Sequence, residues 1–168
     1  MMQSAKSVPD LTYIDTLDEL EAICRVMNNA ERYKQKHPPG DPLHEWGCRA
    51  WDMAFDRMCQ VYANRFDPQS ELERDCLVAV AAYEWVLTDK NGQNTAATRV
   101  RGSINRNGIK VAIANSVLRG KRTIGLKTLI EMNKIGFSFE YVVKKYHDEF
   151  PRKVVEAAEK ALKNLKFS

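Results

Sequence analysis

Residues 89–127 read DKNGQNTAATRVRGSINRNGIKVAIANSVLRGKRTIGLK, and they mark the change from long predicted helices to short ones. The stretch opens with a turn at Asn91-Gly92, and Gly108 and Gly120 interrupt it again. Glycine adopts a positive φ at little cost, so each of these positions is a typical end of a helix. The segment therefore predicts a series of short helices that follow a longer, more regular part of the chain.

Upstream of this stretch, apolar residues recur every three or four positions, which predicts three longer amphipathic helices. The first starts after a cap at Asp15 or Thr16 and ends near Lys36, before the HPPG sequence at 37–40. Asp41-Pro42 and Asp67-Pro68 each combine a cap with a proline suited to a first helical turn. The second helix is expected to reach about residue 65 and the third about residue 88.

Downstream, glycine, serine and proline divide the chain into shorter helices, with Thr95 and Ser138 as expected caps. The predicted ranges are 95–106, 109–118, 123–134, 139–149 and 152–165. These patterns predict an all-α fold in a single domain over 1–168. Its parts are a loose N-terminal arm (1–14), a three-helix core (15–88) and four or five shorter helices that include the basic segment (89–168).

The composition is that of a globular protein, with 168 residues, 44% hydrophobic and 29% charged. No apolar run approaches the roughly 18 residues that span a bilayer, and the first ten residues lack the apolar core of a secretory signal. A cytoplasmic protein without a membrane partner is therefore expected.

The cysteines at positions 24, 48, 59 and 76 lie on or beside predicted apolar stripes, which indicates buried, reduced thiols. His44 and Cys48 share a predicted helix face, but no second pair completes a tetrahedral zinc site. No Ser-His-Asp order or phosphate-loop motif is present, so neither a catalytic set nor a cofactor is expected.

Positive charge is concentrated in the middle of the chain, where residues 86–134 hold 10 basic and 2 acidic side chains. Residues 1–85 instead hold 9 basic and 15 acidic ones. This asymmetry predicts either an anionic partner or pairing within the molecule. The candidate nucleic-acid-binding residues are Arg99, Arg101, Arg106, Lys110, Arg119, Lys121, Arg122 and Lys127.

Helical spacing places Arg99 and Arg106, two turns apart, on one face, and it directs Arg101 elsewhere. The segment has no aromatic residue between Trp85 and Phe137, so the sequence predicts phosphate contacts without a platform for base stacking.

Two further patterns have alternative interpretations. Gly136, Ser138 and Val142 are spaced as in the turn of a helix-turn-helix motif, although Gly-x-Ser at a helix junction equally indicates ordinary capping. Trp46 and Trp51 suggest an aromatic ligand pocket, although aromatic residues at helical spacing also pack in a core.

The segments YEWVLTDKNG (83–92), TAATRVR (95–101) and FSFEYVVKKYHDEF (137–150) resemble small uncharacterised bacterial proteins. The resemblance covers about the C-terminal half. It implies a bacterial, all-helical protein of mobile-element origin, and it implies no activity and no functional residues. In such an arrangement Arg99 is expected to pair with Glu84 or with a phosphate.

These observations favour a non-enzymatic binding protein that contacts nucleic acid through a basic helical surface at 99–127. Two alternatives stay open. The first is a protein-interaction or homo-oligomeric module whose basic region meets an acidic partner. The second is an enzyme with a small-molecule pocket.

Overall fold

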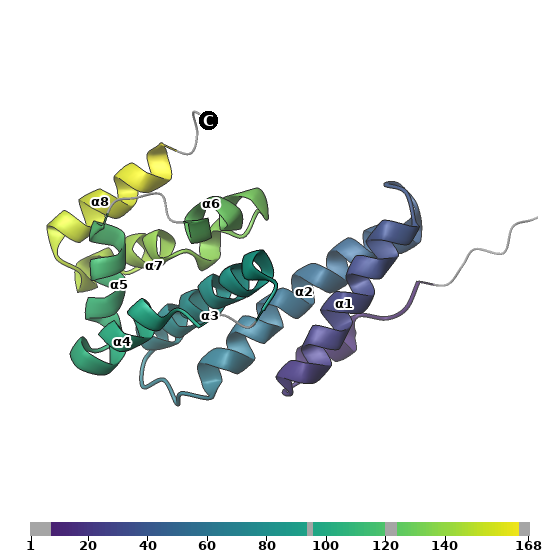
Figure 1. Ribbon diagram of the computed structural model, residues 1–168, viewed down its shortest axis with the longest axis horizontal. Helices are drawn as coiled ribbons and strands as arrows, with labels where there is room; N and C mark the ends of the chain where they lie inside the picture. The colour runs from purple at the N-terminus through teal and green to yellow at the C-terminus, as the bar shows by residue number, and fades with distance from the viewer. Residues whose placement is uncertain (1–7, 94–95, 120–123, 165–168) are drawn as a thin grey trace, which may run out of the picture. The chain divides into compact units, whose positions relative to one another are not determined.

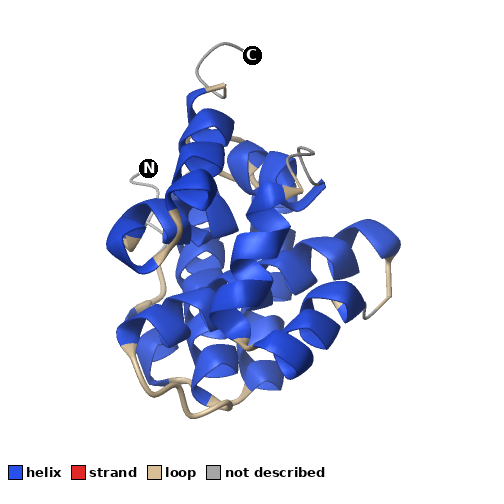
Figure 2. Ribbon diagram, turned by 90° about the vertical axis from the view of Figure 1, so that its left-hand side faces the viewer, coloured by secondary structure: helices blue, strands red, loops and turns tan. Residues whose placement is uncertain are grey.

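The computed structural model describes residues 8–93, 96–119 and 124–164, and the predicted all-α class is confirmed. Within these ranges every regular element is helical and no strand occurs (Figure 2). The α-helices are α1 (Leu20–Lys36), α2 (Pro42–Asn64), α3 (Glu71–Asn91), α4 (Thr98–Asn107), α5 (Ile109–Leu118), α6 (Ile124–Glu131), α7 (Phe139–Lys145) and α8 (Arg152–Lys163). Short 3-10 turns occur at Thr12–Thr16, Ile135–Phe137 and His147–Glu149.

The chain divides into two compact units, Met1–Tyr62 and Ala63–Ser168. The first unit holds α1 and nearly all of α2, and the second holds α3 to α8 (Figure 1). The predicted arrangement, in which three long helices form one core of a single domain, is not confirmed, because α3 groups with the shorter helices that follow it.

In the N-terminal unit, α1 and α2 are held together around fully buried side chains that include Ile14, Ile23 and Phe55. The indole Nε1 of Trp46 donates a hydrogen bond to the carbonyl oxygen of Pro9 at 2.9 Å. Of the expected loose arm, residues 8–14 are described, and the burial of Ile14 and the Pro9 hydrogen bond hold this part on the unit.

The start of α1 differs from the prediction. Asp15 and Thr16 do not cap it, because they lie in a 3-10 turn in which the Thr16 hydroxyl donates to the Tyr13 carbonyl oxygen at 2.7 Å. The helix begins at Leu20, and it ends at Lys36, where the sequence predicts its end. The start of α2 is confirmed, since Pro42 is its first residue and the Asp41 carboxylate accepts from the Leu43 amide at 2.8 Å.

The third helix starts later than predicted. Asp67 adopts φ 48°, which is incompatible with helix, and Ser70 caps α3 by accepting from the Glu73 amide at 3.1 Å. The end of α3 is as predicted, because Gly92 takes the left-handed conformation with φ 65°.

In the C-terminal unit, α7 packs against α3, α5 and α8, and its Val142 and Val143 are buried (Figure 1). The predicted helix over 139–149 is split, because α7 ends at Lys145 and a separate 3-10 turn follows. Asp75 on α3 anchors this end of α7. Its carboxylate accepts from the Lys145 ammonium at 2.6 Å and from the Tyr146 hydroxyl at 2.9 Å.

The joint between α4 and α5 is Gly108, with φ 81°, and these two helices pack on one another. The predicted stop at Asn107-Gly108 is thereby confirmed. The expected cap Thr95 and the expected stop Gly120 lie outside the described residues.

Candidate anion-binding cavity

Six of the eight predicted nucleic-acid-binding residues lie in the described part of the chain, and Lys121 and Arg122 lie outside it. The structure separates these six into two groups by their partners. Arg101, Lys110 and Lys127 each face a carboxylate of their own unit. Arg99, Arg106 and Arg119 are exposed and make no ion pair within the described residues.

Arg101 is held most firmly, by Glu84 of α3. Its Nε and Nη2 atoms donate to the two carboxylate oxygens of Glu84, each at 2.5 Å, and the buried backbone amide of Ala97 donates to the same carboxylate at 2.9 Å. Glu84 is only 8% exposed. The carboxylate thus fixes the start of α4 on α3. The expectation that Arg99 pairs with Glu84 is wrong, because Arg101 takes this place.

Lys110 and Lys127 form ordinary surface ion pairs. The Lys110 ammonium lies 2.8 Å from a Glu149 carboxylate oxygen, and that of Lys127 lies 3.9 Å from Glu131. Such exposed pairs contribute little to stability, but they reduce the positive potential of the surface. The predicted basic region is therefore partly neutralised within its own unit.

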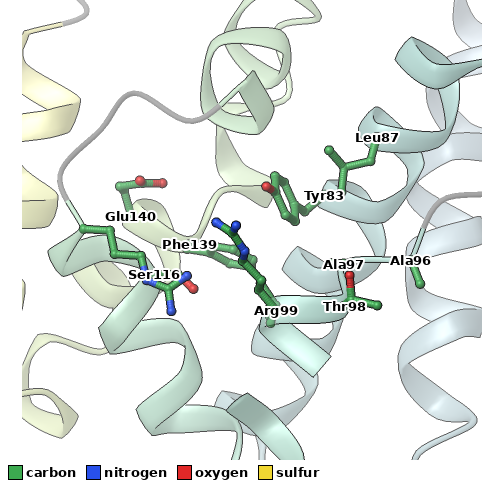
Figure 3. Close-up of a pocket in the computed structure, with 11 residues that line it drawn as sticks. Tyr83, Leu87, Ala96, Ala97, Thr98, Arg99, Ser116, Phe139 and Glu140 are labelled. Carbon is green, nitrogen blue, oxygen red and sulfur yellow. The ribbon is translucent and has the colours of Figure 1, made fainter. Parts of the chain in front are cut away.

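Arg99 and Arg119 come from the first turn of α4 and the end of α5, and they line one cavity of about 440 Å³. Tyr83 of α3 and Phe139 and Glu140 of α7 also line it. Figure 3 shows Arg99, Tyr83 and Glu140 extending from three different helices toward a common space. The turn at Gly108 folds α5 back against α4, and this brings the two arginines to one site.

Arg106 lies on the same face of α4 as Arg99, because seven residues correspond to about two turns and about 10 Å of rise. A methyl group on Gly102 would lie 3.3 Å from the Arg106 guanidinium. The absence of a side chain at Gly102 therefore lets this guanidinium lie along the helix. Arg106 does not line the cavity, but it adds a further positive charge to this face of α4.

The start of α4 also borders the cavity. Ala97 occupies the position before α4; its own side chain provides no cap, and the Glu84 carboxylate accepts from its backbone amide at 2.9 Å. Residues 96–100 line the cavity, so the first turn of α4, where the helix dipole is positive, lies beside it. The combination of arginines and a helix start suits a phosphate or carboxylate group.

Glu140 is the acidic group of the cavity. Burial raises the pKa of its carboxyl, and a hydrogen bond with its own backbone opposes this shift. It makes no ion pair with Arg99 or Arg119 within the described residues. The cavity therefore combines two guanidinium groups with a half-buried carboxyl that is available as a hydrogen-bonding group.

Sequence reasoning missed the aromatic wall of the cavity. The basic segment itself contains no aromatic residue, but the fold brings Tyr83 and Phe139 from its two sides, with ring centroids 5.6 Å apart. Helix periodicity gives no sign of this meeting, because the residues belong to α3 and α7. The sequence gives one weak indication, because Tyr83 and Phe139 lie in the segments that flank the basic stretch on either side.

The helix-turn-helix interpretation gains no support from the described residues. Ser138 acts as an ordinary cap of α7, accepting from the Tyr141 amide at 3.1 Å. α7 has seven residues and packs against three other helices of its unit.

The two tryptophans of α2 are packed in the N-terminal unit. Trp46 is 7% exposed and meets Tyr33 edge-on at 4.9 Å, and Trp51 stacks on Phe55 at 5.3 Å. A depression of about 520 Å³ lies beside Trp46, and Trp51 does not line it. The depression beside Trp46 is therefore not a pocket shared by the two indoles.

The histidine and cysteine side chains lie in different surroundings. The described residues contain no group of three His, Cys, Asp or Glu side chains arranged to hold a metal ion. The Nδ1 atom of His44 lies 2.9 Å from the carbonyl oxygen of His37. Cys59 and Cys76 are buried thiols as predicted, Cys48 is half-buried, and Cys24 is exposed, contrary to prediction.

Comparisons with protein-family models, with curated proteins and with solved structures find no match to this chain. Among the described helices, none is both long and apolar enough to cross a bilayer.

Proposed function

We propose that this is a non-enzymatic binding protein whose C-terminal unit contacts the phosphates of nucleic acid through Arg99, Arg106 and Arg119. The observation that carries the proposal is the convergence of Arg99 and Arg119, from two helices, on one cavity without an ion-pair partner among the described residues. Arg101, Lys110 and Lys127, which have such partners, take no part.

Phosphate is the anion that this arrangement fits best. A guanidinium group binds phosphate oxygens through two parallel hydrogen bonds and stays charged at all physiological pH values. The start of α4 borders the same cavity, and the Glu84 carboxylate already accepts from its Ala97 amide. Arg106, on the same face of α4, supplies a further contact for the next part of a polyanion.

The test is binding of fluorescently labelled strands of about 20 nucleotides, single and duplex, measured by anisotropy at about 50 and about 200 mM salt. The variant R99Q/R119Q removes two charges from the cavity. The matched control R152Q/K153Q removes two exposed charges from α8, outside the cavity. Two lost phosphate contacts are expected to reduce the slope of log affinity against log salt by about 2.

The control variant is expected to bind as the unmodified protein does. Equal losses in both variants would show a general effect of net charge rather than a site. Absence of binding to any strand at the lower salt concentration would refute the proposal.

A homo-oligomeric module is the second candidate, supported by Val111 and Leu118. These apolar side chains are 45% and 39% exposed and lie seven residues apart, hence on one face of α5. Light scattering over a range of protein concentrations tests this candidate, and a constant monomer mass would exclude it.

A further inference from the structure

The cavity that holds Arg99 and Arg119 has a second, apolar side. Tyr83 and Phe139 form it, with their rings tilted by 58° to each other. Both residues are half-buried, and both line the cavity (Figure 3). A site with guanidinium groups at one side and aromatic rings at the other is suited to a ligand that has an anionic end and a flat ring.

The aromatic wall is held in place from behind. Gly125 of α6 lies so close to Tyr83 that a Cβ atom on it would come within 2.2 Å of the ring. On the other side, the cap at Ser138 and the Asp75 contacts at the end of α7 fix the helix that carries Phe139. The rings therefore form a preorganised surface, which lowers the entropy cost of binding.

The volume of the cavity, about 440 Å³, is within the range of roughly 300 to 1,000 Å³ for small-molecule sites. Glu140 adds a hydrogen-bonding group to the lining, close in sequence to the Phe139 ring. A carboxyl group accepts hydrogen bonds from ring N–H and amino groups, which are present on nucleobases.

We propose that this cavity accepts one unstacked nucleobase, with Tyr83 and Phe139 against its ring and Arg99 and Arg119 on the adjoining phosphate. The inference rests on the proposed function and makes it more specific, because it assigns single-stranded nucleic acid or a free nucleotide as the ligand. A base paired within a duplex does not reach the cavity unless it leaves the stack, which costs free energy.

The experiment compares four probes with the full chain at about 50 mM salt: a labelled single strand of about 12 nucleotides, an abasic strand of equal length, the corresponding duplex, and nucleoside monophosphates as competitors. Stacking of one base is expected to make the single strand bind about tenfold more tightly than the abasic strand. The duplex is expected to bind no better than the abasic strand.

The variant F139L keeps apolar volume but removes the ring, and it is expected to abolish most of this difference. F139Y restores a ring and is expected to recover it. F66L serves as the matched control, because Phe66 is 54% exposed and does not line the cavity. If F139L does not fold, the comparison of the base-bearing and abasic strands still tests the proposal.

Equal affinity for the base-bearing and abasic strands would overturn the base pocket while leaving the phosphate contacts intact. Loss of both affinities, with no binding at low salt, would overturn the proposed function as well. Competition by nucleoside monophosphates, but not by ribose 5-phosphate, would identify a free nucleotide as a ligand. If neither compound competes and the base-bearing strand still binds more tightly than the abasic strand, the ligand is single-stranded nucleic acid rather than a free nucleotide.

Discussion

The contact between Arg101 and Glu84 gives the sharpest test of how the cavity is built. We expect Arg101→Ala to destabilise the C-terminal unit, because it removes the guanidinium from a carboxylate that is only 8% exposed. The Ala97 amide still donates to Glu84 in this variant, but a neutral backbone donor does not replace a cation.

The expected cost follows from the geometry. Two charge-assisted hydrogen bonds contribute roughly 1.5–3 kcal/mol each when they are well shielded. The Arg101 side chain is 46% exposed, so solvent screening reduces this sum by about half, to about 1.5–3 kcal/mol. Glu84→Gln is expected to cost less, about 1 kcal/mol, because a buried amide needs no counter-charge and its oxygen still accepts from the Ala97 amide.

The measurement is urea unfolding of the full chain at pH 7, followed by circular dichroism, with hydrogen exchange to locate the loss of stability in α4. The control is Arg152→Ala. Arg152 also pairs with a glutamate, Glu156, but its side chain is 92% exposed, so the expected cost is below about 0.5 kcal/mol.

The reasoning is refuted if Arg101→Ala changes the free energy of unfolding no more than Arg152→Ala does, or if Glu84→Gln costs more than Arg101→Ala. The double variant gives a further check. Its cost is expected to be smaller than the sum of the two single costs, because both changes remove the same interaction.

Three further predictions concern other residues of the protein. Because burial raises the pKa of Glu140, its ionised form destabilises the folded protein at pH 7, and this destabilisation disappears as the pH falls below the ordinary value of 4.5. E140Q should therefore raise the melting temperature at pH 7 but not at pH 4. An equal rise at both pH values would contradict the raised pKa of Glu140. Gly125→Ala should lower the free energy of unfolding by about 1–3 kcal/mol, measured by urea unfolding, because the steric clash with Tyr83 outweighs the gain in helix propensity. An unchanged urea midpoint would show that the Tyr83 ring moves aside at no cost. Burial raises the pKa of Cys76 to about 12, so N-ethylmaleimide should not modify this thiol in the native protein, whereas it should modify the exposed Cys24. Mass spectrometry of the labelled peptides measures the two rates, and equal rates would contradict this prediction.

The helix ends show how far local sequence determines structure. The ends at Lys36, Gly92 and Gly108 and the cap at Ser138 were predictable, because proline, glycine and serine act on the backbone within a few residues of themselves. The starts of α1 and α3 were predicted too early. Several polar residues there were able to cap, and burial of Ile14 favours a 3-10 turn before α1, whereas the positive φ of Asp67 delays α3.

The sequence by itself determined the all-α class, most helix ends and the concentration of positive charge between residues 86 and 134. These features depend on residues close together in the chain. Only the tertiary structure decided which cations are paired, because Glu84 reaches Arg101 and Glu149 reaches Lys110 across different helices. It also decided that Arg99 and Arg119 share a cavity with Tyr83 and Phe139, since contacts between distant segments follow from packing, which helical periodicity does not specify.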